Sequence, residues 1–214
     1  GQLHLVFADT AGVADRLIDS LLANGDSVIQ VRPGTTLRRI NNTEFVIPTD
    51  SPEGIQHVLE LAASGDVTLA SVIHCWSLDH AVASELDVAS LRFAQQTGTL
   101  SALYLAQMLA ALDWTTTPKV TIVTCGAQAA APADSVNGLA SSPIVGFLRV
   151  ANNELPQFHW THVDLDEIQT PDGVVMAAAS VLQEIERPGE EREIAFRGRS
   201  RLVNRMRSIS DTDL

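Results

Sequence analysis

The sequence of 214 residues lacks a long hydrophobic run, a surplus of basic residues and a framework of cysteines. Polar residues interrupt its most apolar stretches well before about 20 positions, so no membrane-spanning helix is predicted. The formal net charge of −12 argues against nucleic acid as the main partner. The only two cysteines, Cys75 and Cys125, each end an apolar run and have no other metal ligand at suitable spacing. We interpret both as buried, reduced thiols, and we expect a cytoplasmic protein without a metal site.

Apolar runs alternate with helical patterns along nearly the whole chain, and several runs are continuously hydrophobic, as in parallel strands covered on both faces. The predicted strands are 3–8, 26–31, 43–48, 70–76, 119–125, 159–165 and 191–196. The predicted helices are 12–24, 52–64, 80–97, 99–112, 141–155 and 171–186. This alternation predicts one α/β domain over residues 1–207, with a doubly wound, mostly parallel sheet in the strand order 3-2-1-4-5-6-7. Residues 208–214 are expected to form a frayed tail or linker.

The turn between the first predicted strand and helix corresponds to a nucleotide-binding loop that has lost most of its glycines. In the short-chain-reductase form of this loop, GxxxGxG, the glycines let the backbone approach a pyrophosphate at a helix N-terminus. Here Ala8 and Ala14 occupy the first and last glycine positions, and only Gly12 remains. Asp9 adds a negative charge where two phosphates would lie. We therefore predict that this segment binds no nicotinamide cofactor.

The Tyr-x-x-x-Lys pair of such reductases is absent as well. The single tyrosine is Tyr104, and the residue four positions later is Met108. The fifth predicted strand ends near Thr124, a hydroxyl in the neighbourhood of the reductases' serine, but it has no tyrosine or lysine to act with. We predict no catalytic residue in this chain. Tyr104 is interpreted as a buried helix residue whose hydroxyl has a structural partner.

Other polar residues near strand ends receive structural interpretations. In an intact site Arg32 would be placed to hold the 2′-phosphate of NADP, but the broken loop favours a solvated arginine in a turn. His74 and Trp76 flank Cys75 where open α/β sheets place ligands, and packing of Trp76 against a helix with Asp79 capping the next helix is the favoured interpretation. No chemistry is assigned to His57, His80, His159 and His162.

Nine segments, in order over almost the entire chain, resemble the structural subdomain of the ketoreductase region in modular type I polyketide synthases. They are VFAD (6–9), VRPG (31–34), SPEG (51–54), VIHCWSLD (72–79), AQQTGTLSALYLAQML (94–109), VTIVTCGAQ (120–128), SSPIVGFLRV (141–150), HVDLDE (162–167) and EIAFRGRSRLVNRM (193–206). The chain departs from the family at 151–156, where it has ANNELP in place of a run similar to ALEHPE.

This resemblance implies a truncated Rossmann-like domain that binds no cofactor itself. It implies a noncatalytic scaffold that packs against, and stabilises, a catalytic ketoreductase subdomain with NADPH. Neighbouring synthase domains and an acyl carrier protein are the further partners that it implies, with neither nucleic acid nor a membrane among them. Whether the chain counts as an enzyme is left open, because the activity would belong to the whole synthase.

Several alternatives stay open at this point. The chain starts at Gly1, and nothing after residue 207 begins a second glycine loop, so we expect an excised piece, a half separated from its partner by an inserted domain such as an enoyl reductase, or a remnant beside a methyltransferase or dehydratase. Two other functions are an independent NADP(H)-dependent oxidoreductase with an unusual loop, and a protein-binding module that uses its C-terminal arginines.

The late segment 191–206 is predicted to contact the partner domain. A strand over 200–206 would place Arg201, Val203 and Arg205 on one face, and Leu202 and Asn204 on the other. This mixture of charged and apolar residues is more typical of a strand at a domain boundary than of one inside a core.

Overall fold

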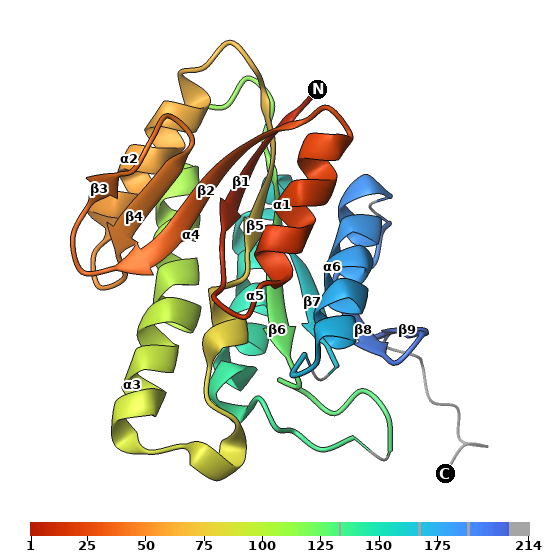
Figure 1. The fold of residues 1–214 in the computed structure, drawn as a ribbon. Coiled ribbons are helices and arrows are strands. Elements are labelled where there is room, and N and C mark those ends of the chain that lie inside the picture. Colours follow the sequence, from red (N-terminus) through yellow and green to blue (C-terminus); the bar gives the residue numbers. More distant parts are fainter. Residues whose placement is uncertain (133, 167, 188, 206–214) are drawn as a thin grey trace.

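The fold is built around one twisted, mostly parallel sheet. The computed structural model describes residues 1–132, 134–166, 168–187 and 189–205, so the tail predicted at 208–214 lies outside the described residues. The strands are β1 (Leu3–Phe7), β2 (Ser27–Gly34), β3 (Arg38–Arg39), β4 (Glu44–Pro48), β5 (Leu69–His74), β6 (Lys119–Cys125), β7 (Thr161–Leu165), β8 (Glu193–Arg197) and β9 (Ser200–Val203). Their order is β3-β4-β2-β1-β5-β6-β7-β8-β9 (Figure 1).

The predicted order of seven parallel strands is confirmed. The parallel strands follow one another across the sheet in the order β4, β2, β1, β5, β6, β7, β8. Two short strands were not predicted. β3 pairs antiparallel with β4, and β9 pairs antiparallel with β8. Both lie at the edges and are too short to show a hydrophobic period, which is why the sequence pattern missed them.

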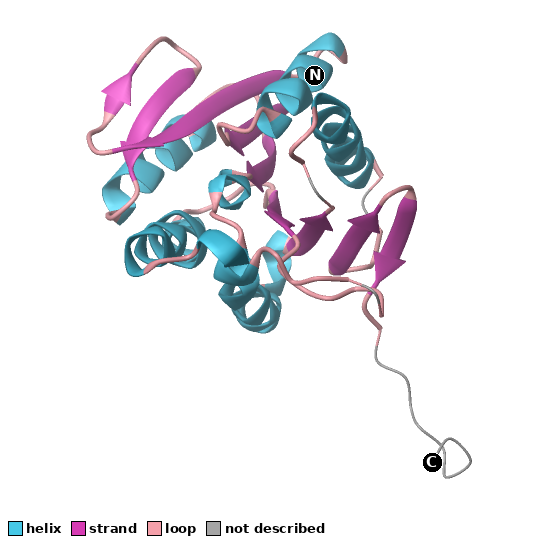
Figure 2. Ribbon diagram, turned by 60° about the horizontal axis from the view of Figure 1, so that its bottom comes forward, coloured by secondary structure: helices cyan, strands magenta, loops and turns pink. Residues whose placement is uncertain are grey.

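Helices cover both faces of the sheet (Figure 2). They are α1 (Val13–Ala23), α2 (Pro52–Ala63), α3 (Val88–Gln95), α4 (Ser101–Ala111), α5 (Ser142–Glu154) and α6 (Pro171–Glu186). Helices α1 and α6 pack against one face, and α2, α4 and α5 against the other. Within the described ranges, no helix combines the length and the apolar character needed to cross a membrane.

Side chains from each strand enter two separate cores, because successive residues point to opposite faces of the sheet. In β1, Leu5 and Phe7 join the core under α2, α4 and α5, whereas Val6 joins the core under α1 and α6. All five residues of β1 are buried. This two-sided burial accounts for the continuous hydrophobic runs in the sequence.

The segment 80–97 differs from its prediction as one helix. Two 3₁₀ turns, Trp76–Asp79 and Ala83–Glu85, precede α3, which begins only at Val88. Asp87 sets this start: its side chain accepts a hydrogen bond from the Ser90 N–H at 2.7 Å, and the Ser90 hydroxyl donates to the Asp87 side chain in turn. The N-cap residue Asp87, and not the apolar spacing of the residues before it, therefore decides where helix α3 begins.

The break predicted between residues 97 and 99 is also wrong. A π-helical turn, Gln96–Leu100, joins α3 to α4, so that one helix runs from Val88 to Ala111 (Figure 1). Gly98 lies in this turn, and a Cβ there would come within 2.8 Å of the His80 ring. The glycine permits close packing of the helix on His80 and does not end the helix.

Candidate functional site

The loop between β1 and α1 is filled by a carboxylate of the chain itself. Asp9 is fully buried and accepts hydrogen bonds from the backbone N–H groups of Gly12 at 2.8 Å, Val13 at 3.1 Å and Ala14 at 2.7 Å. These donors belong to the N-terminus of α1, where helical carbonyls cannot satisfy them. The Asp9 carboxylate thus takes the place at the positive end of the helix that a phosphate takes in dinucleotide-binding folds.

A second carboxylate closes the rest of the loop. Asp79, from the 3₁₀ turn after β5, accepts hydrogen bonds from the Thr10 N–H at 2.8 Å, the Ala11 N–H at 3.2 Å and the Thr10 hydroxyl at 2.8 Å. The expectation that Asp79 caps the next helix is therefore wrong. β1 and β5 are neighbours in the sheet, so their carboxyl ends meet and bring Asp79 to this loop. Every backbone N–H from Thr10 to Ala14 donates to one of the two carboxylates.

The two alanines at former glycine positions are core residues. Ala8 and Ala14 are fully buried and pack in the core under α1 and α6. Gly12 is different, because its φ of 98° lies in the left-handed region, where a side chain is strained. The loop has therefore kept the one glycine that its own turn requires, and has replaced the glycines that a ligand would need.

Arg32 is also engaged inside the chain. It lies in β2, not in a turn, and its guanidinium donates to the Asp9 carbonyl at 3.0 Å and to the Asp15 carboxylate at 2.6 Å. The prediction of a solvated arginine is wrong, because the carboxyl end of β2 lies beside that of β1 and brings the side chain over the loop. Burial raises the pKa of Asp9, while the N–H groups of Ala14 and Val13 oppose that shift.

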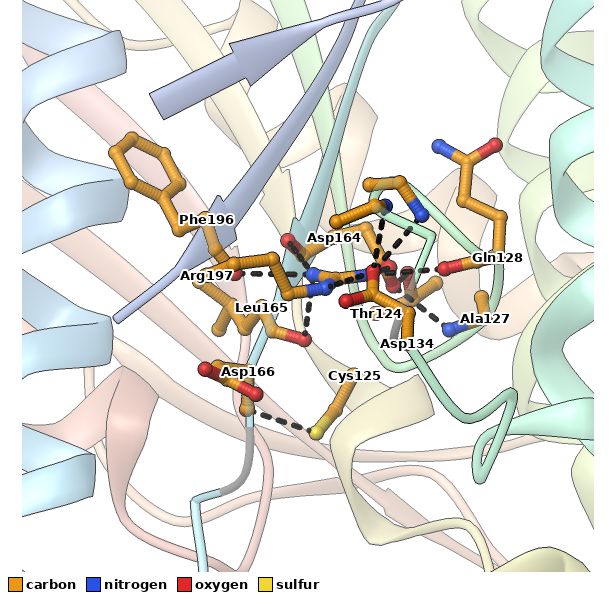
Figure 3. A network of polar contacts seen from close by, with 12 residues as sticks. Thr124, Cys125, Ala127, Gln128, Asp134, Asp164, Leu165, Asp166, Phe196 and Arg197 are labelled. Atoms are coloured by element: carbon orange, nitrogen blue, oxygen red, sulfur yellow. Dashed lines mark hydrogen bonds and ion pairs between the residues drawn. The ribbon is translucent and has the colours of Figure 1, made fainter. Parts of the chain in front are cut away.

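Thr124, in the neighbourhood of a reductase's serine, is held in a buried network (Figure 3). Its hydroxyl donates to Asp164 at 2.6 Å and accepts from Nε2 of His162 at 2.8 Å. All three side chains are fully buried. Because the Thr124 hydroxyl donates its single proton to Asp164, it has no second proton to donate to another group in this arrangement.

Arg197 ties this network to the loop after β6. Its guanidinium donates to Asp164 and to Asp134, both at 2.7 Å, and to the Gln128 carbonyl at 2.8 Å (Figure 3). Arg197 is one of the C-terminal arginines, and the sequence pattern assigned it no role of its own. One signal in the sequence could have indicated this contact: Arg197 ends β8, and Asp164 lies near the end of the neighbouring strand β7.

Trp76 is a packing residue, as expected, and His74 is buried beside it. Trp76 is fully buried, its ring lies 5.1 Å from that of Phe7, and its indole N–H donates to the Val31 carbonyl at 3.3 Å. His74 is buried with Nε2 2.9 Å from the Ser101 hydroxyl. Neither side chain presents a polar group to solvent.

The single tyrosine lies on α4, half-buried, against the core under α2, α4 and α5. Among the described residues, the Tyr104 hydroxyl has no hydrogen-bond partner, so the expected structural partner is wrong: the half-exposed position leaves the hydroxyl to solvent. Met108 stands one turn further along α4, also half-buried. No acid–base pair forms there.

Both cysteine thiols are free. Cys75 is buried as expected, whereas Cys125 is only half-buried and its thiol donates to the Asp166 carbonyl at 3.0 Å. Burial raises the pKa of Cys75 well above its ordinary value and that of Cys125 to about 11. Both thiols are therefore protonated at neutral pH. In the described ranges, no three His, Cys, Asp or Glu side chains are grouped to hold a metal ion.

A small cavity of about 220 Å³ lies at the carboxyl edge of the sheet, where open α/β folds bind ligands. Ser77, His80, Cys125, Asn137 and Arg197 are among its lining residues, which include neither tyrosine nor lysine. Its volume falls below the roughly 300–1,000 Å³ of ordinary ligand pockets. The cavity is thus smaller than an ordinary ligand pocket, and it lacks the tyrosine and lysine side chains of the Tyr-x-x-x-Lys pair.

The residues predicted to contact a partner are engaged within the chain. Arg201 makes a two-pronged ion pair with Glu184 of α6, at 2.5 and 2.9 Å, and Arg205 pairs with Glu191. Val203 packs, partly buried, against the core under α1 and α6. Whether these three residues also meet another domain stays a prediction.

The fold and the loop define the class: a Rossmann-like domain of the short-chain-reductase type, with the nucleotide loop closed. The family described as "Polyketide synthase extender module SpnB, Rossmann fold domain" matches residues 43–206, and the chain belongs to that family. None of the curated proteins matches the chain.

Three solved structures illustrate the likeness. A multidomain structure with adenylation, ketoreductase and pseudo Asub parts, from a keto acid-selecting NRPS module, has a TM-score of 0.82 at 23% identity over 95% of this chain. An N-terminal ketoreductase from the macrolactin assembly line has a TM-score of 0.72 at 14% identity over 98% of this chain. A short-chain dehydrogenase/reductase from Serratia marcescens has a TM-score of 0.64 at 12% identity over 92% of this chain.

The share of each relative that is matched differs sharply. The chain spans 16% of the NRPS module and 42% of the macrolactin ketoreductase, but 96% of the Serratia protein. In length, the chain therefore covers nearly all of the single-domain Serratia protein and less than half of the macrolactin ketoreductase.

Removing the Asp9 carboxylate tests its role in the loop. Asp9→Ala leaves three N–H groups at the start of α1 without an acceptor, and we expect the free energy of unfolding to fall by about 3 kcal/mol in urea denaturation. Asp79→Ala is the matched control, because Thr10 and Ala11 are exposed to water; a loss of about 1 kcal/mol is expected. Equal effects of the two substitutions would contradict the assignment.

Acid should destabilise the chain through one buried and one partly buried histidine, His74 and His80. Burial lowers the pKa of His74 to about 3 and that of His80 to about 4, so the unfolded chain binds their protons first as the pH falls below about 6.5. Their stabilising contribution is complete above pH 6.5 and is lost below it, by roughly 4 kcal/mol in total at pH 5.

Urea denaturation above pH 6.5 and at pH 5 measures this loss of stability, and the His80→Gln variant is the comparison. The variant should lose about 2 kcal/mol of the drop, the share of one histidine, because burial still lowers the pKa of His74, His4 and His162. An unchanged drop in His80→Gln would show that His80 takes up its proton in the folded chain.

Charge reversal separates the internal roles of the C-terminal arginines. Arg201→Glu leaves the side chain of Glu184, which is 4% exposed, without its partner, and should lower the free energy of unfolding by about 2 kcal/mol. Arg205→Glu, at a side chain that is 71% exposed, should change it by less than about 1 kcal/mol. A larger loss for Arg205→Glu than for Arg201→Glu would contradict this ranking.

Proposed function

We propose that this chain is the noncatalytic scaffold half of a polyketide synthase ketoreductase, and that it packs against and stabilises an NADPH-dependent catalytic subdomain. One observation carries the proposal: the five N–H groups from Thr10 to Ala14, which would cradle a pyrophosphate, donate to the chain's own Asp9 and Asp79. A loop with no free donor offers a dinucleotide nothing to bind.

Charge strengthens this argument. A pyrophosphate at the start of α1 would lie beside the carboxylates of Asp9 and Asp79, and each like-charge pair at 4 Å costs about 4 kcal/mol near a protein surface. Arg32, a cation beside this loop, is already bound to Asp15 and the Asp9 carbonyl. Displacing Asp9 would in turn leave a buried charge without its donors.

The missing proton donor supports the same conclusion. Reduction of a ketone needs a hydride from the cofactor and a proton from a positioned acid. Thr124 is buried and its proton is used by Asp164, and Tyr104 is a half-buried residue of α4 without a lysine one turn on. The proton and the hydride must therefore come from another part of the synthase.

The share of its relatives that the chain spans is consistent with a half-ketoreductase, because it covers 42% of the macrolactin enzyme. The proposal extends to a domain over residues 1–207, to neighbouring synthase domains and an acyl carrier protein as further partners, and to NADPH bound by the catalytic subdomain alone. Protonated, free thiols at Cys75 and Cys125 are consistent with a cytoplasmic location.

An independent NADP(H)-dependent oxidoreductase is the second candidate. The observation in its favour is the match to nearly the whole length of the Serratia short-chain dehydrogenase/reductase. That match concerns the fold only, and function depends on the site. The closed loop and the missing tyrosine–lysine pair argue against it.

Calorimetric titration of the chain with NADPH and with NADH distinguishes the two candidates. No saturable binding is expected up to about 1 mM cofactor, since a weaker complex is worth less than about 4 kcal/mol. A short-chain dehydrogenase titrated under the same conditions serves as the positive control. A micromolar dissociation constant for either cofactor would overturn the scaffold proposal in favour of the oxidoreductase.

A further inference from the structure

A second cavity, which we call the amino-edge cavity, lies at the end of the sheet opposite to the β1–α1 loop, beside the N-terminus marked in Figure 1. It is lined by residues at the amino ends of β1, β5, β6 and β7, by the last turns of α6 and by the loop before β8. Its volume is about 820 Å³. Unlike the cavity at the carboxyl edge, it therefore lies within the roughly 300–1,000 Å³ of ordinary ligand pockets.

The floor of the amino-edge cavity is polar, although the sheet face that it continues is apolar. Three neighbouring strands contribute to it His4 from β1, Ser71 from β5 and Thr121 from β6. Two positions later on each of these strands, the side chain belongs to the apolar core under α1 and α6. The three polar side chains are 3%, 5% and 7% exposed. Burying polar groups costs free energy unless they gain partners, so packing alone does not account for this floor.

A β-bulge forms part of the same floor. The pairing of β1 with β5 shifts by one residue at this level, so that Ala70 is an extra residue on β5. Bulges are rare between parallel strands, and beside binding sites they re-aim a side chain. Beyond the bulge, the Ser71 hydroxyl lies 2.7 Å from Nδ1 of His4. The other ring nitrogen of His4, Nε2, is buried without a hydrogen bond, and Asp26 is 3.5 Å away from it.

Three basic side chains line one part of the amino-edge cavity. Lys119 begins β6, His159 precedes β7 and Arg192 precedes β8, and these three strands are neighbours in the sheet. The Arg192 guanidinium donates to Nδ1 of His159 at 2.8 Å, so the proton of the neutral ring is on Nε2, which remains a donor. Burial and the positive charges of Arg192 and Lys119 lower the pKa of His159. The ring is therefore neutral at pH 7.

The charges of Lys119 and Arg192 are not neutralised within the described residues. Neither side chain forms an ion pair there, whereas five other arginines do. The chain holds 26 acidic and 14 basic residues, so carboxylate partners are plentiful elsewhere. Of the acidic side chains that line the cavity, Glu184 is paired with an arginine, and Asp66 and Glu190 are exposed to water, which screens their charges. Two unpaired cations beside one histidine are a site for an anion.

We propose that the amino-edge cavity binds a small organic oxyanion, a phosphate monoester or a carboxylate, whose charged group is held by Lys119, Arg192 and the Nε2–H of His159. The planar guanidinium matches two oxygens of either group, and the ammonium adds a point charge. The rest of the ligand lies on the polar floor, where the Thr121 hydroxyl and Nε2 of His4 suit a body with hydroxyl or amide groups. This inference is independent of the scaffold function, because it concerns the opposite edge of the sheet.

Calorimetric titration of the chain at low salt tests this inference, with glycerol 3-phosphate and malonate as the probes. At least one of these anions should bind saturably, one to one, with a dissociation constant of about 1 mM or less, and the tighter one identifies the charged group. Glycerol, the uncharged part of the first probe, should not bind. Absence of saturable binding of both anions up to about 10 mM would overturn the inference.

Charge-removing variants locate the bound anion. Lys119→Gln and Arg192→Gln should each raise the dissociation constant at least about tenfold, because a charged contact is lost. Arg92→Gln is the matched control: it removes the same charge from an exposed residue of α3 outside the cavity lining, and should change the constant by less than about twofold. Lys119 is exposed and has no ion pair, so Lys119→Gln should melt within about 2 °C of the unsubstituted chain.

The remaining outcomes are equally decisive. Unchanged affinity in both Lys119→Gln and Arg192→Gln, or an equal loss in Arg92→Gln, would place the anion elsewhere on the chain and overturn the inference. Inorganic phosphate that binds as tightly as glycerol 3-phosphate would show that a bare ion satisfies the site, and would overturn the assignment of an organic ligand. None of these results alters the scaffold function, which the NADPH titration tests separately.

Discussion

The closure of the β1–α1 loop by Asp9 is the interaction on which the carboxyl edge of the sheet depends. The carboxylate satisfies three helix N–H groups that would otherwise be buried without an acceptor, and this fixes the start of α1 against the sheet. Asp79 attaches the same loop to β5, and Arg32 attaches it to β2. Three neighbouring strands are thereby joined around one acidic side chain.

This arrangement explains how the start of α1 is stabilised by a group of the chain itself. In a dinucleotide-binding domain the phosphate supplies the negative charge at the helix N-terminus. Here Asp9 supplies it permanently, so folding does not wait for a ligand. The Thr124–Asp164–Arg197 network acts similarly at the end of β6, β7 and β8, where it holds in place the loop that would border a substrate. Both closures use residues at the positions where a short-chain reductase binds its cofactor and reacts.

The sequence by itself determined the order of the seven parallel strands. Strands that are buried on both faces have continuous apolar sequences, and right-handed crossover connections allow few strand orders. It also determined the loss of the nucleotide loop, since Ala8, Asp9 and Ala14 are neighbours in the chain. Only the tertiary structure decided what the polar groups do. Asp79 meets Thr10 across 69 positions and Arg197 meets Asp164 across 33, and both contacts arise from strands that adjoin in the sheet. Periodicity reports which way a residue faces along its own element, and it carries no information on which distant polar group faces it in return.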